Sequence, residues 1–331
     1  MKSKIILLTS SIFISLFLME TLIRVFKPVH YSLFFDYSNK EWQQDSANLS
    51  TLIEPSNTMG YKLIPHRGRG YFKVNSLGIM DRERSIEKEG GIFRIVALGD
   101  SITYGGMPTY VQFLEDILNK NTVGHKFEVW NCGVPAYNTA QEFNFLNYKC
   151  LSFKPDLVIL QFCLNDFETT PIVIKEGKDT VIYWPKRQVA KFINPTFFKY
   201  SHLYRRIIFS LLFNRPTKAQ EKYNIVLSSL EQMKNLLFPK DIKLFVIVFP
   251  YLKNYKSYDS YERWQYDSIL NILNKLNIDF LDLTNTFHKS NSDVEELSMG
   301  DGLHPNSKGH KLVAEVIFKN LSDRLLLSKL R

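Results

Sequence analysis

Three residues of this chain have the side-chain types of a nucleophilic catalytic triad. Ser101 lies in the stretch Arg94–Gly105 (RIVALGDSITYG), just after an apolar run that ends in glycine, and Asp301 lies three positions before His304 in the sequence DGLH. A serine hydroxyl becomes a strong nucleophile only when a base removes its proton, and the base needs an acid to orient it. We therefore expect Ser101 to be the nucleophile, His304 the general base, and Asp301 the acceptor for the imidazole Nδ1–H.

Two other positions offer hydrogen-bond donors for the oxyanion of an acyl-transfer reaction. Gly133 lies in the sequence NCGVPAY, and the N–H of a glycine can approach a ligand closely. Asn165 follows a third apolar run and carries a side-chain amide. Together with the N–H of Ser101 at a helix start, these groups would supply three donors to one oxyanion.

Neighbouring residues are expected to be structural, and the candidates themselves also have simpler interpretations. We expect Asp100 and Asp166 to hold their loops by hydrogen bonds to the backbone, and Gly99 ends the apolar run before the serine. Ser101 could instead cap the helix that follows it, and Asn165 could be only a turn residue. An Asp-x-x-His spacing also arises by chance in a chain with seven histidines.

The elements that must position these residues are indicated by alternating strand and helix patterns after Gly91. Continuous apolar runs, as expected for strands buried on both faces, occur at Phe93–Leu98, Phe127–Trp130, Leu157–Phe162, Leu244–Phe249 and Phe280–Leu283. Helical stretches occur at Pro108–Asn119, Ala140–Leu151, Lys218–Leu237, Tyr261–Leu276 and Ser307–Leu327. The pattern predicts a three-layer α/β/α sandwich with a mostly parallel sheet of about five strands. Ligands of such folds bind beyond the carboxyl ends of the strands, where Ser101 lies.

Four short sequence blocks occur in a fixed order, each after its own predicted strand. They are Gly99–Ser101, Gly133, Asn165–Asp166 and Asp301–His304. In this order they resemble the four blocks of the SGNH (GDSL-like) hydrolases, and the N-terminal part is similar to that of membrane-anchored bacterial members. The resemblance implies a flavodoxin-like α/β fold, the triad and oxyanion-hole roles given above, and hydrolysis or transfer of an ester-linked acyl group through an acyl-enzyme.

One position departs from the family pattern. The third block normally begins with glycine, whereas Cys163 stands two residues before Asn165. This cysteine could be a reactive thiol or a small buried hydrophobic residue, and it would change the shape of the pocket. With Cys132 and Cys150 it makes an odd count of three, without CxxC or metal-ligand spacing. We expect neither a disulfide framework nor a zinc site, and no other metal or cofactor.

The composition favours a membrane surface over nucleic acid as the surroundings of the protein. Lys plus Arg number 42 against 33 Asp plus Glu, a formal net charge of +9, and no compact basic motif accompanies this excess. The alternative is a lysine-rich composition without functional meaning. We expect no nucleic-acid partner.

The N-terminus is typical of a membrane helix. Two lysines precede Ile5–Met19, 15 residues without a charge, and apolar character continues to Phe26 with Glu20 and Arg24 four positions apart. About 20 residues are needed to cross the hydrocarbon core. Because no convincing small-x-small cleavage site follows, an uncleaved signal anchor over residues 1–27 is favoured over a cleaved signal peptide. The catalytic domain is expected on the extracytoplasmic face, membrane-anchored or, after cleavage, secreted.

The rest of the chain divides into an accessory segment and a larger domain. Residues 28–90 are predicted to be extended, with short strands or extended segments at Gly60–Leu63, Gly70–Val74 and Asn75–Met80. Residues 91–331 are predicted to form the hydrolase domain, with an insertion at about 167–216. Within the insertion, residues 182–215 hold seven basic residues, nine aromatics and no acid. This stretch could be a lid that meets anionic lipid or glycan, or a helix packed on the core.

The sequence therefore predicts a membrane-anchored serine esterase or O-acyl transferase. Its expected substrate is a small-molecule, glycan or lipid ester, in particular an O-acylated carbohydrate or lipid of the cell envelope. The alternative is a catalytically inactive protein of the same fold that binds glycans or takes part in envelope assembly. The presence of Ser101, Asp301 and His304 favours the enzyme.

Overall fold

The computed structural model of the chain contains two compact units. The first, which we call the helix unit, holds residues 1–36 and 169–218, and the second, the sheet unit, holds residues 37–168 and 219–331. The residues that the structure describes are 2–26, 49–68, 70, 73–105, 108–176, 179–183, 194, 197, 200–213, 217–289 and 294–323. All the candidate site residues lie in the sheet unit.

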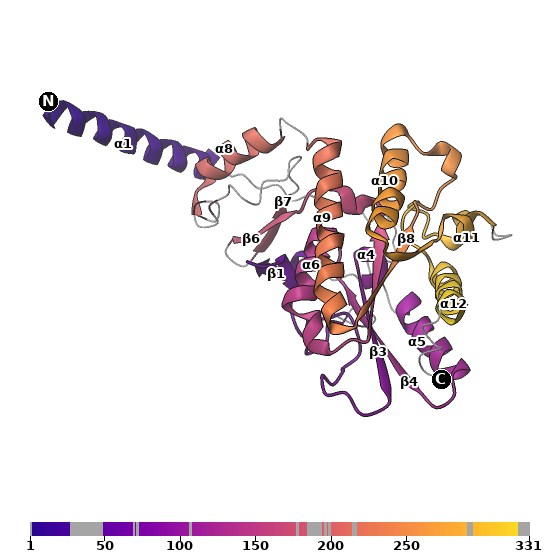
Figure 1. Cartoon of the computed structure of the whole chain (residues 1–331). Coiled ribbons are helices and arrows are strands. Elements are labelled where there is room, and N and C mark those ends of the chain that lie inside the picture. The colour runs from indigo at the N-terminus through magenta and orange to yellow at the C-terminus, as the bar shows by residue number, and fades with distance from the viewer. Residues whose placement is uncertain are drawn as a thin grey trace. The chain divides into compact units, whose positions relative to one another are not determined.

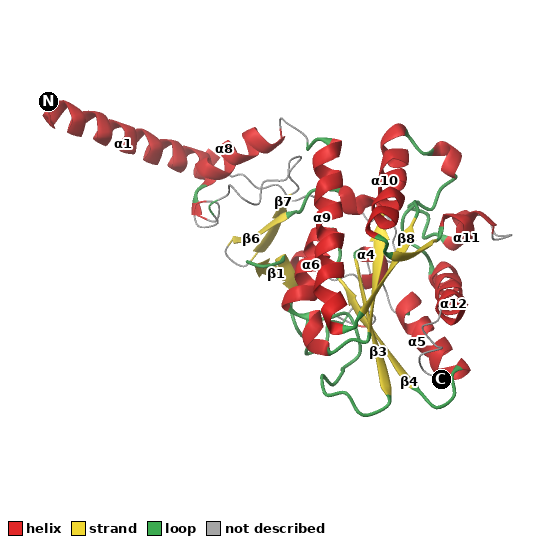
Figure 2. Ribbon diagram, viewed as in Figure 1, coloured by secondary structure: helices red, strands yellow, loops and turns green. Residues whose placement is uncertain are grey.

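Five parallel strands form the central sheet, in the order β4-β3-β5-β8-β9 (Figure 2). Their bounds are β3 Ile92–Gly99, β4 Lys126–Gly133, β5 Leu157–Cys163, β8 Lys243–Phe249 and β9 Asp279–Asp282. Each strand overlaps one of the predicted apolar runs. All 7 residues of β5 are buried, because this strand is central and covered on both faces. The predicted α/β/α sandwich with about five parallel strands is confirmed.

Helices cover both faces of the sheet (Figure 1). The long helices are α5 Tyr110–Asn121, α6 Thr139–Tyr148, α9 Ala219–Leu237, α10 Ser260–Leu276 and α12 Ser307–Asp323. Helices α5 and α12 pack together on one face, and α6 packs with α9 on the other. The connections β3–α5–β4 and β4–α6–β5 cross the sheet in opposite directions. Because such crossovers are right-handed, their helices fall on opposite faces.

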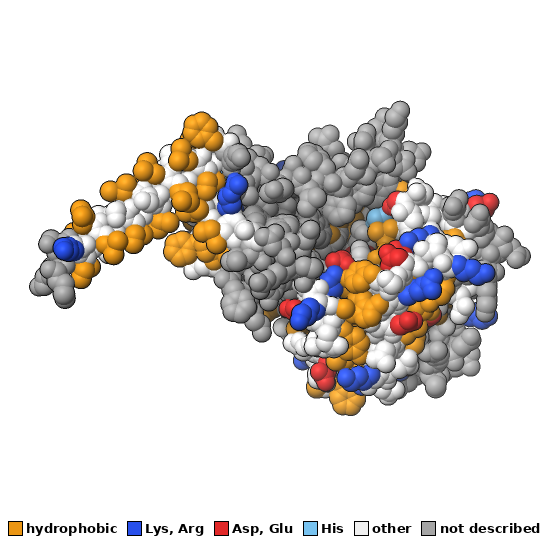
Figure 3. Space-filling model, turned by 90° about the horizontal axis from the view of Figure 1, so that it is seen from above, with side chains coloured by type: hydrophobic (Ala, Val, Ile, Leu, Met, Phe, Trp, Pro, Cys, Tyr) orange, Lys and Arg blue, Asp and Glu red, His pale blue; other side chains and the backbone are white. Residues whose placement is uncertain are grey.

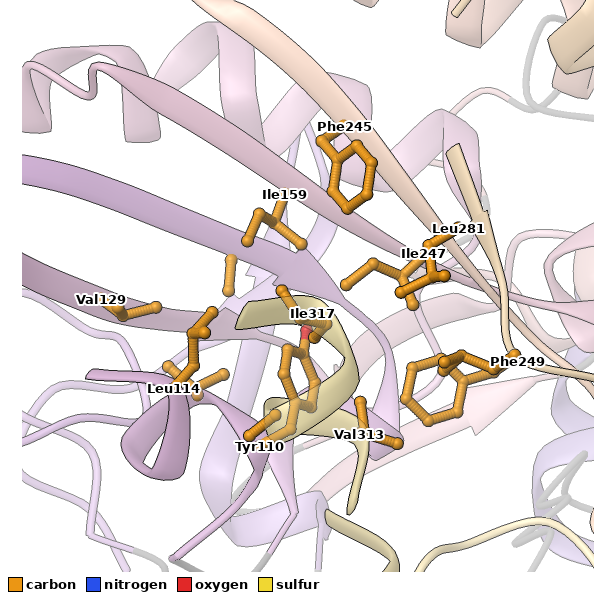
Figure 4. Packing of buried hydrophobic residues seen from close by; sticks show 14 of the residues in the cluster. Tyr110, Leu114, Val129, Ile159, Phe245, Ile247, Phe249, Leu281, Val313 and Ile317 are labelled. Atoms are coloured by element: carbon orange, nitrogen blue, oxygen red, sulfur yellow. The ribbon is translucent and has the colours of Figure 1, made fainter. Parts of the chain in front are cut away.

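The apolar core on the α5 face is built from one stripe of each helix. Tyr110 and Leu114 of α5 lie opposite Val313 and Ile317 of α12, over strand residues such as Ile247 (Figure 4). All five are buried. Residues four positions apart on a helix lie on the same side, so each helix buries one apolar stripe against the sheet.

Side-chain caps determine where several helices begin. Thr109, Asn138 and Asp259 cap α5, α6 and α10, each with a reciprocal bond from the residue three positions later. The predicted starts of α5 and α6 therefore differ from the observed ones by one or two residues. The shorter helices are α3 Leu49–Leu52, α4 Ser101–Tyr104, α11 Thr284–Lys289, η2 Cys150–Phe153, η3 Leu164–Phe167, η4 Phe238–Lys240, η5 Tyr255–Ser257 and η6 Val294–Leu297.

The outer edge of β4 is covered by carboxylates. Its unpaired backbone N–H groups at Asn131 and Val129 donate to Asp81 Oδ2 (3.1 Å) and Glu115 Oε2 (2.7 Å). Arg84 bridges the two acids, at 3.0 Å from Asp81 and 2.9 Å from Glu115. An exposed strand edge is a template for unwanted pairing, so this ion network both satisfies and protects the edge.

The described part of the accessory segment holds the short helix α3, a small hairpin and several turns. Residues 71–72 of the expected extended segment Gly70–Val74 lie outside the described residues. Strands β1 Ile53–Ser56 and β2 Gly60–Leu63 pair antiparallel. The expected extended segment at Asn75–Met80 is wrong, because the Asn75 side chain accepts the N–H groups of Leu77 (2.9 Å) and Ile79 (3.2 Å) and closes a turn.

The helix unit contains the N-terminal helix and the part of the insertion that is described. Its elements are α1 Lys2–Phe26, the antiparallel pair β6 Ile172–Glu176 and β7 Asp179–Tyr183, and α8 His202–Phe213. Hydrophobic side chains cover α1 along its length (Figure 3). In the described part of the chain, α1 is the one helix long and apolar enough to cross a membrane.

Candidate active site

Ser101, His304 and Asp301 form a continuous hydrogen-bonded series in the structure. Ser101 Oγ lies 2.8 Å from His304 Nε2, and His304 Nδ1 lies 2.5 Å from Asp301 Oδ2. The histidine is buried, whereas the aspartate is partly exposed. The serine and the histidine lie 203 positions apart in the chain, and the fold brings them together as the sequence predicted.

A tight turn aims the Asp301 carboxylate at the imidazole. Its Oδ1 accepts the backbone N–H groups of Leu303 (2.9 Å) and His304 (2.8 Å), which leaves Oδ2 for the ring. Burial acts to raise the pKa of Asp301, but the hydrogen bonds and charge of His304 outweigh it and lower the pKa to about 2. Asp301 is therefore a carboxylate over the whole working range of pH, as an orienting group for a histidine base must be.

Hydrogen bonds to two buried side chains, Asp100 and Gln161, fix the turn that carries Ser101. Asp100 is the N-cap of α4, and its Oδ1 accepts the N–H of Ile102 at 2.9 Å. Gln161 Oε1 accepts both the Asp100 N–H (3.2 Å) and the Thr103 hydroxyl (2.9 Å). The alternative that Ser101 is only a helix cap is wrong, because Asp100 fills that position and Ser101 is the first helical residue.

Close packing explains the two glycines of the first and second blocks. A Cβ on Gly99 would collide with the side chains of Gln161 and Thr103, and one on Gly133 would lie 2.7 Å from Tyr104 Cα. A side chain at either position would displace α4 and the serine with it.

The three expected oxyanion donors differ in availability. The N–H of Ser101 is at the first position of α4, where a helix offers no backbone acceptor. Asn165 Nδ2 donates to Asp100 Oδ2 at 3.2 Å and has a second hydrogen to give. The N–H of Gly133, however, donates to Asn131 Oδ1 at 3.0 Å. The prediction of Gly133 as an open donor is therefore corrected, because a neighbouring side chain occupies its N–H.

Three buried carboxyl groups lie near these donors. Asp100, Glu142 and Asp166 are all buried. Burial, reinforced by the neighbouring acids, raises the pKa of Glu142 and Asp166 well above the ordinary range, and burial also raises that of Asp100. Asp166 Oδ2 accepts the Thr139 hydroxyl at 3.3 Å, so Asp166 ties η3 to the start of α6.

Cys163 and His310 are core residues next to the site. Cys163 is buried within the hydrophobic cluster of the α5 face, and burial raises the pKa of its thiol well above the ordinary range. A reactive thiolate is thereby disfavoured. His310 is buried and stacks on Tyr110, and burial lowers its pKa to about 3, so it packs as a neutral ring.

Sequence reasoning missed Gln161, Thr103 and Glu142. Gln161 could have been found as the one polar residue in the apolar run Leu157–Phe162. Thr103 and Glu142 gave no such signal, because each lies in a stretch of ordinary helical composition.

Comparison with known proteins identifies the family. The model of the GDSL-like Lipase/Acylhydrolase family matches residues 97–312, a range that contains the serine, the histidine and the aspartate. The chain belongs to this family. It is an ester-bond hydrolase of the SGNH (GDSL-like) type, and a small-molecule ester substrate fits this family. No curated protein sequence matches the chain.

Solved structures show distant similarity. The lipase/acylhydrolase from Enterococcus faecalis is 18% identical, with a TM-score of 0.47 over 70% of this chain and 96% of that one. LAE5, an alpha/beta hydrolase enzyme from the metagenome of Lake Arreo, is 15% identical, with a TM-score of 0.48 over 71% and 96%. Axe2, an acetylxylan esterase from Geobacillus stearothermophilus, is 14% identical, with a TM-score of 0.47 over 69% and 94%. The family assignment depends on the family model.

Proposed function

We propose that Ser101 is the nucleophile of this esterase and that the reaction passes through an acyl-enzyme. The observation that carries the proposal is the chain of contacts from Ser101 Oγ through His304 to Asp301, at 2.8 and 2.5 Å. A base within hydrogen-bond reach of the hydroxyl, itself oriented by a carboxylate, is the arrangement that nucleophilic catalysis needs.

In the proposed mechanism, His304 Nε2 takes the proton of Ser101 as Oγ bonds to the ester carbonyl carbon. The negative charge that forms on the carbonyl oxygen is stabilised by the Ser101 N–H and the second amide hydrogen of Asn165. Collapse of this intermediate breaks the bond to the alkoxy oxygen, which receives the proton from His304. A water or an acceptor hydroxyl then gives its proton to His304 and attacks the acyl group. The bond between the acyl carbon and Ser101 Oγ breaks, and His304 returns the proton to Oγ.

The proposed substrate is an O-acylated carbohydrate or lipid of the cell envelope, and the protein is proposed to be anchored with its sheet unit on the extracytoplasmic face. The apolar helix α1 and the net charge of +9 support a location at an anionic membrane surface. The acceptor decides between hydrolase and acyl transferase: water gives hydrolysis, and a sugar or lipid hydroxyl gives transfer. Secretion after cleavage of α1 is the alternative location.

Labelling by a fluorophosphonate probe tests the nucleophile. Wild-type protein and Ser152→Ala, which alters an exposed serine, are expected to be labelled, whereas Ser101→Ala is expected to resist. Wild-type protein that resists as fully as Ser101→Ala would favour the inactive, glycan-binding alternative.

A substrate screen tests the acyl group and the acceptor. Nitrophenyl esters of increasing chain length, offered with and without sugar acceptors, are analysed by product mass. An acylated sugar indicates transfer, and free acid alone indicates hydrolysis.

A further inference from the structure

The membrane-helix candidate α1 carries two charges near its C-terminal end. Glu20 and Arg24 lie within Lys4–Phe26, the part of the helix with the length and composition of a membrane span. At a rise of about 1.5 Å per residue, Glu20 lies roughly 9 Å before the end of the helix at Phe26. A charged side chain at that depth in a bilayer is costly unless it is paired or reaches the interface.

Both charges find their partners in the insertion, more than 170 positions away in the chain. The Glu20 carboxylate accepts the Ser201 hydroxyl (2.7 Å) and the backbone N–H groups of His202 (2.9 Å) and Leu203 (2.8 Å). These groups form the start of α8, where helical N–H groups otherwise lack acceptors. Glu20 therefore acts as a cap supplied by another helix.

Arg24 completes this connection. Its Nε lies 2.8 Å from Glu20 Oε1, and its Nη2 donates to the carbonyl oxygen of Tyr200, the residue two positions before α8. Helices α1 and α8 also pack against each other within the helix unit. The start of α8 is thus held beside Glu20, which lies before the C-terminal end of α1 at Phe26.

The segment held at this level exposes large hydrophobic side chains. Phe197 and Tyr200 are each 61% exposed and Ile207 is 48% exposed, while Arg206 of the same helix is also exposed. The hydrophobic side chains of α1 are also exposed along its length. Aromatic and aliphatic side chains beside a basic residue are typical of helices that lie in the membrane interface.

We propose that α8, with the described residues 197 and 200–201 before it, forms a second membrane-contacting element. It lies in the interfacial region of a phospholipid bilayer and is docked on α1 through Glu20. The proposal rests on the proposed membrane anchoring by α1. It also requires that α1 is retained in the mature protein, because cleavage would remove the acceptor at the start of α8.

Depth-dependent fluorescence quenching tests this placement. The full chain with Ile207→Cys is labelled with bimane and reconstituted into phosphatidylcholine–phosphatidylglycerol vesicles that contain brominated lipid. The three native cysteines are buried, so the label goes to the introduced one. The matched control is Val123→Cys, which is 97% exposed and lies in the sheet unit. Quenching at position 207 is expected to exceed that at position 123 about threefold or more.

A third label separates this proposal from membrane anchoring itself. Phe13→Cys reports on the middle of α1. Quenching at 13 but no more at 207 than at 123 overturns the placement of α8 alone, whereas no quenching at 13 overturns the anchoring as well. Neither result bears on labelling of Ser101 by fluorophosphonate.

Changing Glu20 tests the docking. Glu20→Leu removes the acceptor and is expected to halve the quenching at 207 or reduce it further, with quenching at 13 unchanged. Glu20→Gln keeps an acceptor oxygen and is expected to retain most of it. Equal quenching at 207 in wild type and Glu20→Leu would overturn the role of Glu20.

Discussion

Asp100 links the proposed nucleophile to the proposed oxyanion donor. One of its oxygens caps α4, whose first residue is Ser101, and the other accepts the amide of Asn165. The serine and the amide are therefore fixed relative to each other by a single buried carboxyl group. This arrangement preorganises the donor, which is how hydrogen bonds stabilise an oxyanion without reorganisation during the reaction.

Asn165→Ala is expected to lower kcat about 10²- to 10³-fold with little change in KM, because the lost hydrogen bond acts mainly on the charge of the transition state. Steady-state kinetics on a soluble nitrophenyl ester measure both values. Asn121→Ala, which alters an exposed asparagine at the end of α5, is the control and is expected to behave like the wild type. A loss of less than about threefold in Asn165→Ala would remove this residue from the proposed oxyanion hole.

The three residues of the proposed triad could be predicted, and the residues that hold them in place mostly could not. Ser101, Asp301 and His304 have side chains suited to a triad, and each follows a predicted strand. The side-chain type and the position in the predicted fold therefore indicated the same residues. The acceptor for the Gly133 N–H could not be predicted, because it depends on the rotamer of Asn131. Glu142 is hidden for another reason, since nothing in a helical stretch marks an acid as buried.

At the scale of elements, each predicted apolar run overlaps one strand of the observed sheet. The strands were found because continuous burial requires continuous apolar sequence. The turn at Asn75 was missed, because a single side chain overrides the extended tendency of its neighbours. The docking of α8 on α1 could not be foreseen either, because the contact joins segments more than 170 positions apart.

Helix α6 carries an acid on its buried side. Both oxygens of Glu142 are buried without a hydrogen-bond partner among the described residues, and Asp166 and Asp100 are the acids whose charges face it. Its pKa in the folded protein is raised well above the ordinary value of about 4.3. Folding therefore takes up a proton, and the free energy of unfolding falls as pH rises from about 4 toward the raised pKa.

Glu142→Gln is expected to weaken this pH dependence. The variant keeps the shape of the side chain without the charge, so its free energy of unfolding should exceed that of the wild type at pH 8 by about 1–3 kcal/mol. The difference should shrink on acidification toward pH 4. Urea denaturation in detergent across this range measures it, and Glu221→Gln on the exposed side of α9 should leave the pH dependence as it is. Parallel curves for wild type and Glu142→Gln would contradict the assignment of Glu142 as a buried neutral acid.

At the scale of the whole molecule, the proposed catalytic groups and the proposed membrane-contacting helices belong to different compact units. The series from Ser101 to Asp301 and the large apolar core lie in the sheet unit, whereas α1 and α8 lie in the helix unit. A unit with its own core keeps its structure when a neighbouring unit is altered. Turnover of a small soluble ester and attachment to the membrane should therefore be separable.

A chain that lacks residues 2–26 is expected to keep kcat/KM for nitrophenyl acetate within about twofold of the full chain, because none of the proposed catalytic contacts involves α1. The same chain should float with phospholipid vesicles in a density gradient much less than the full chain does, since it has lost the apolar span and the helix on which α8 docks. Circular dichroism checks that the shortened chain is folded, and Ser101→Ala in the full chain gives the converse pattern of flotation without turnover. A folded, shortened chain that is inactive on the soluble ester would mean that α1 supports the site itself. One that floats as fully as the full chain would place the main membrane attachment outside α1.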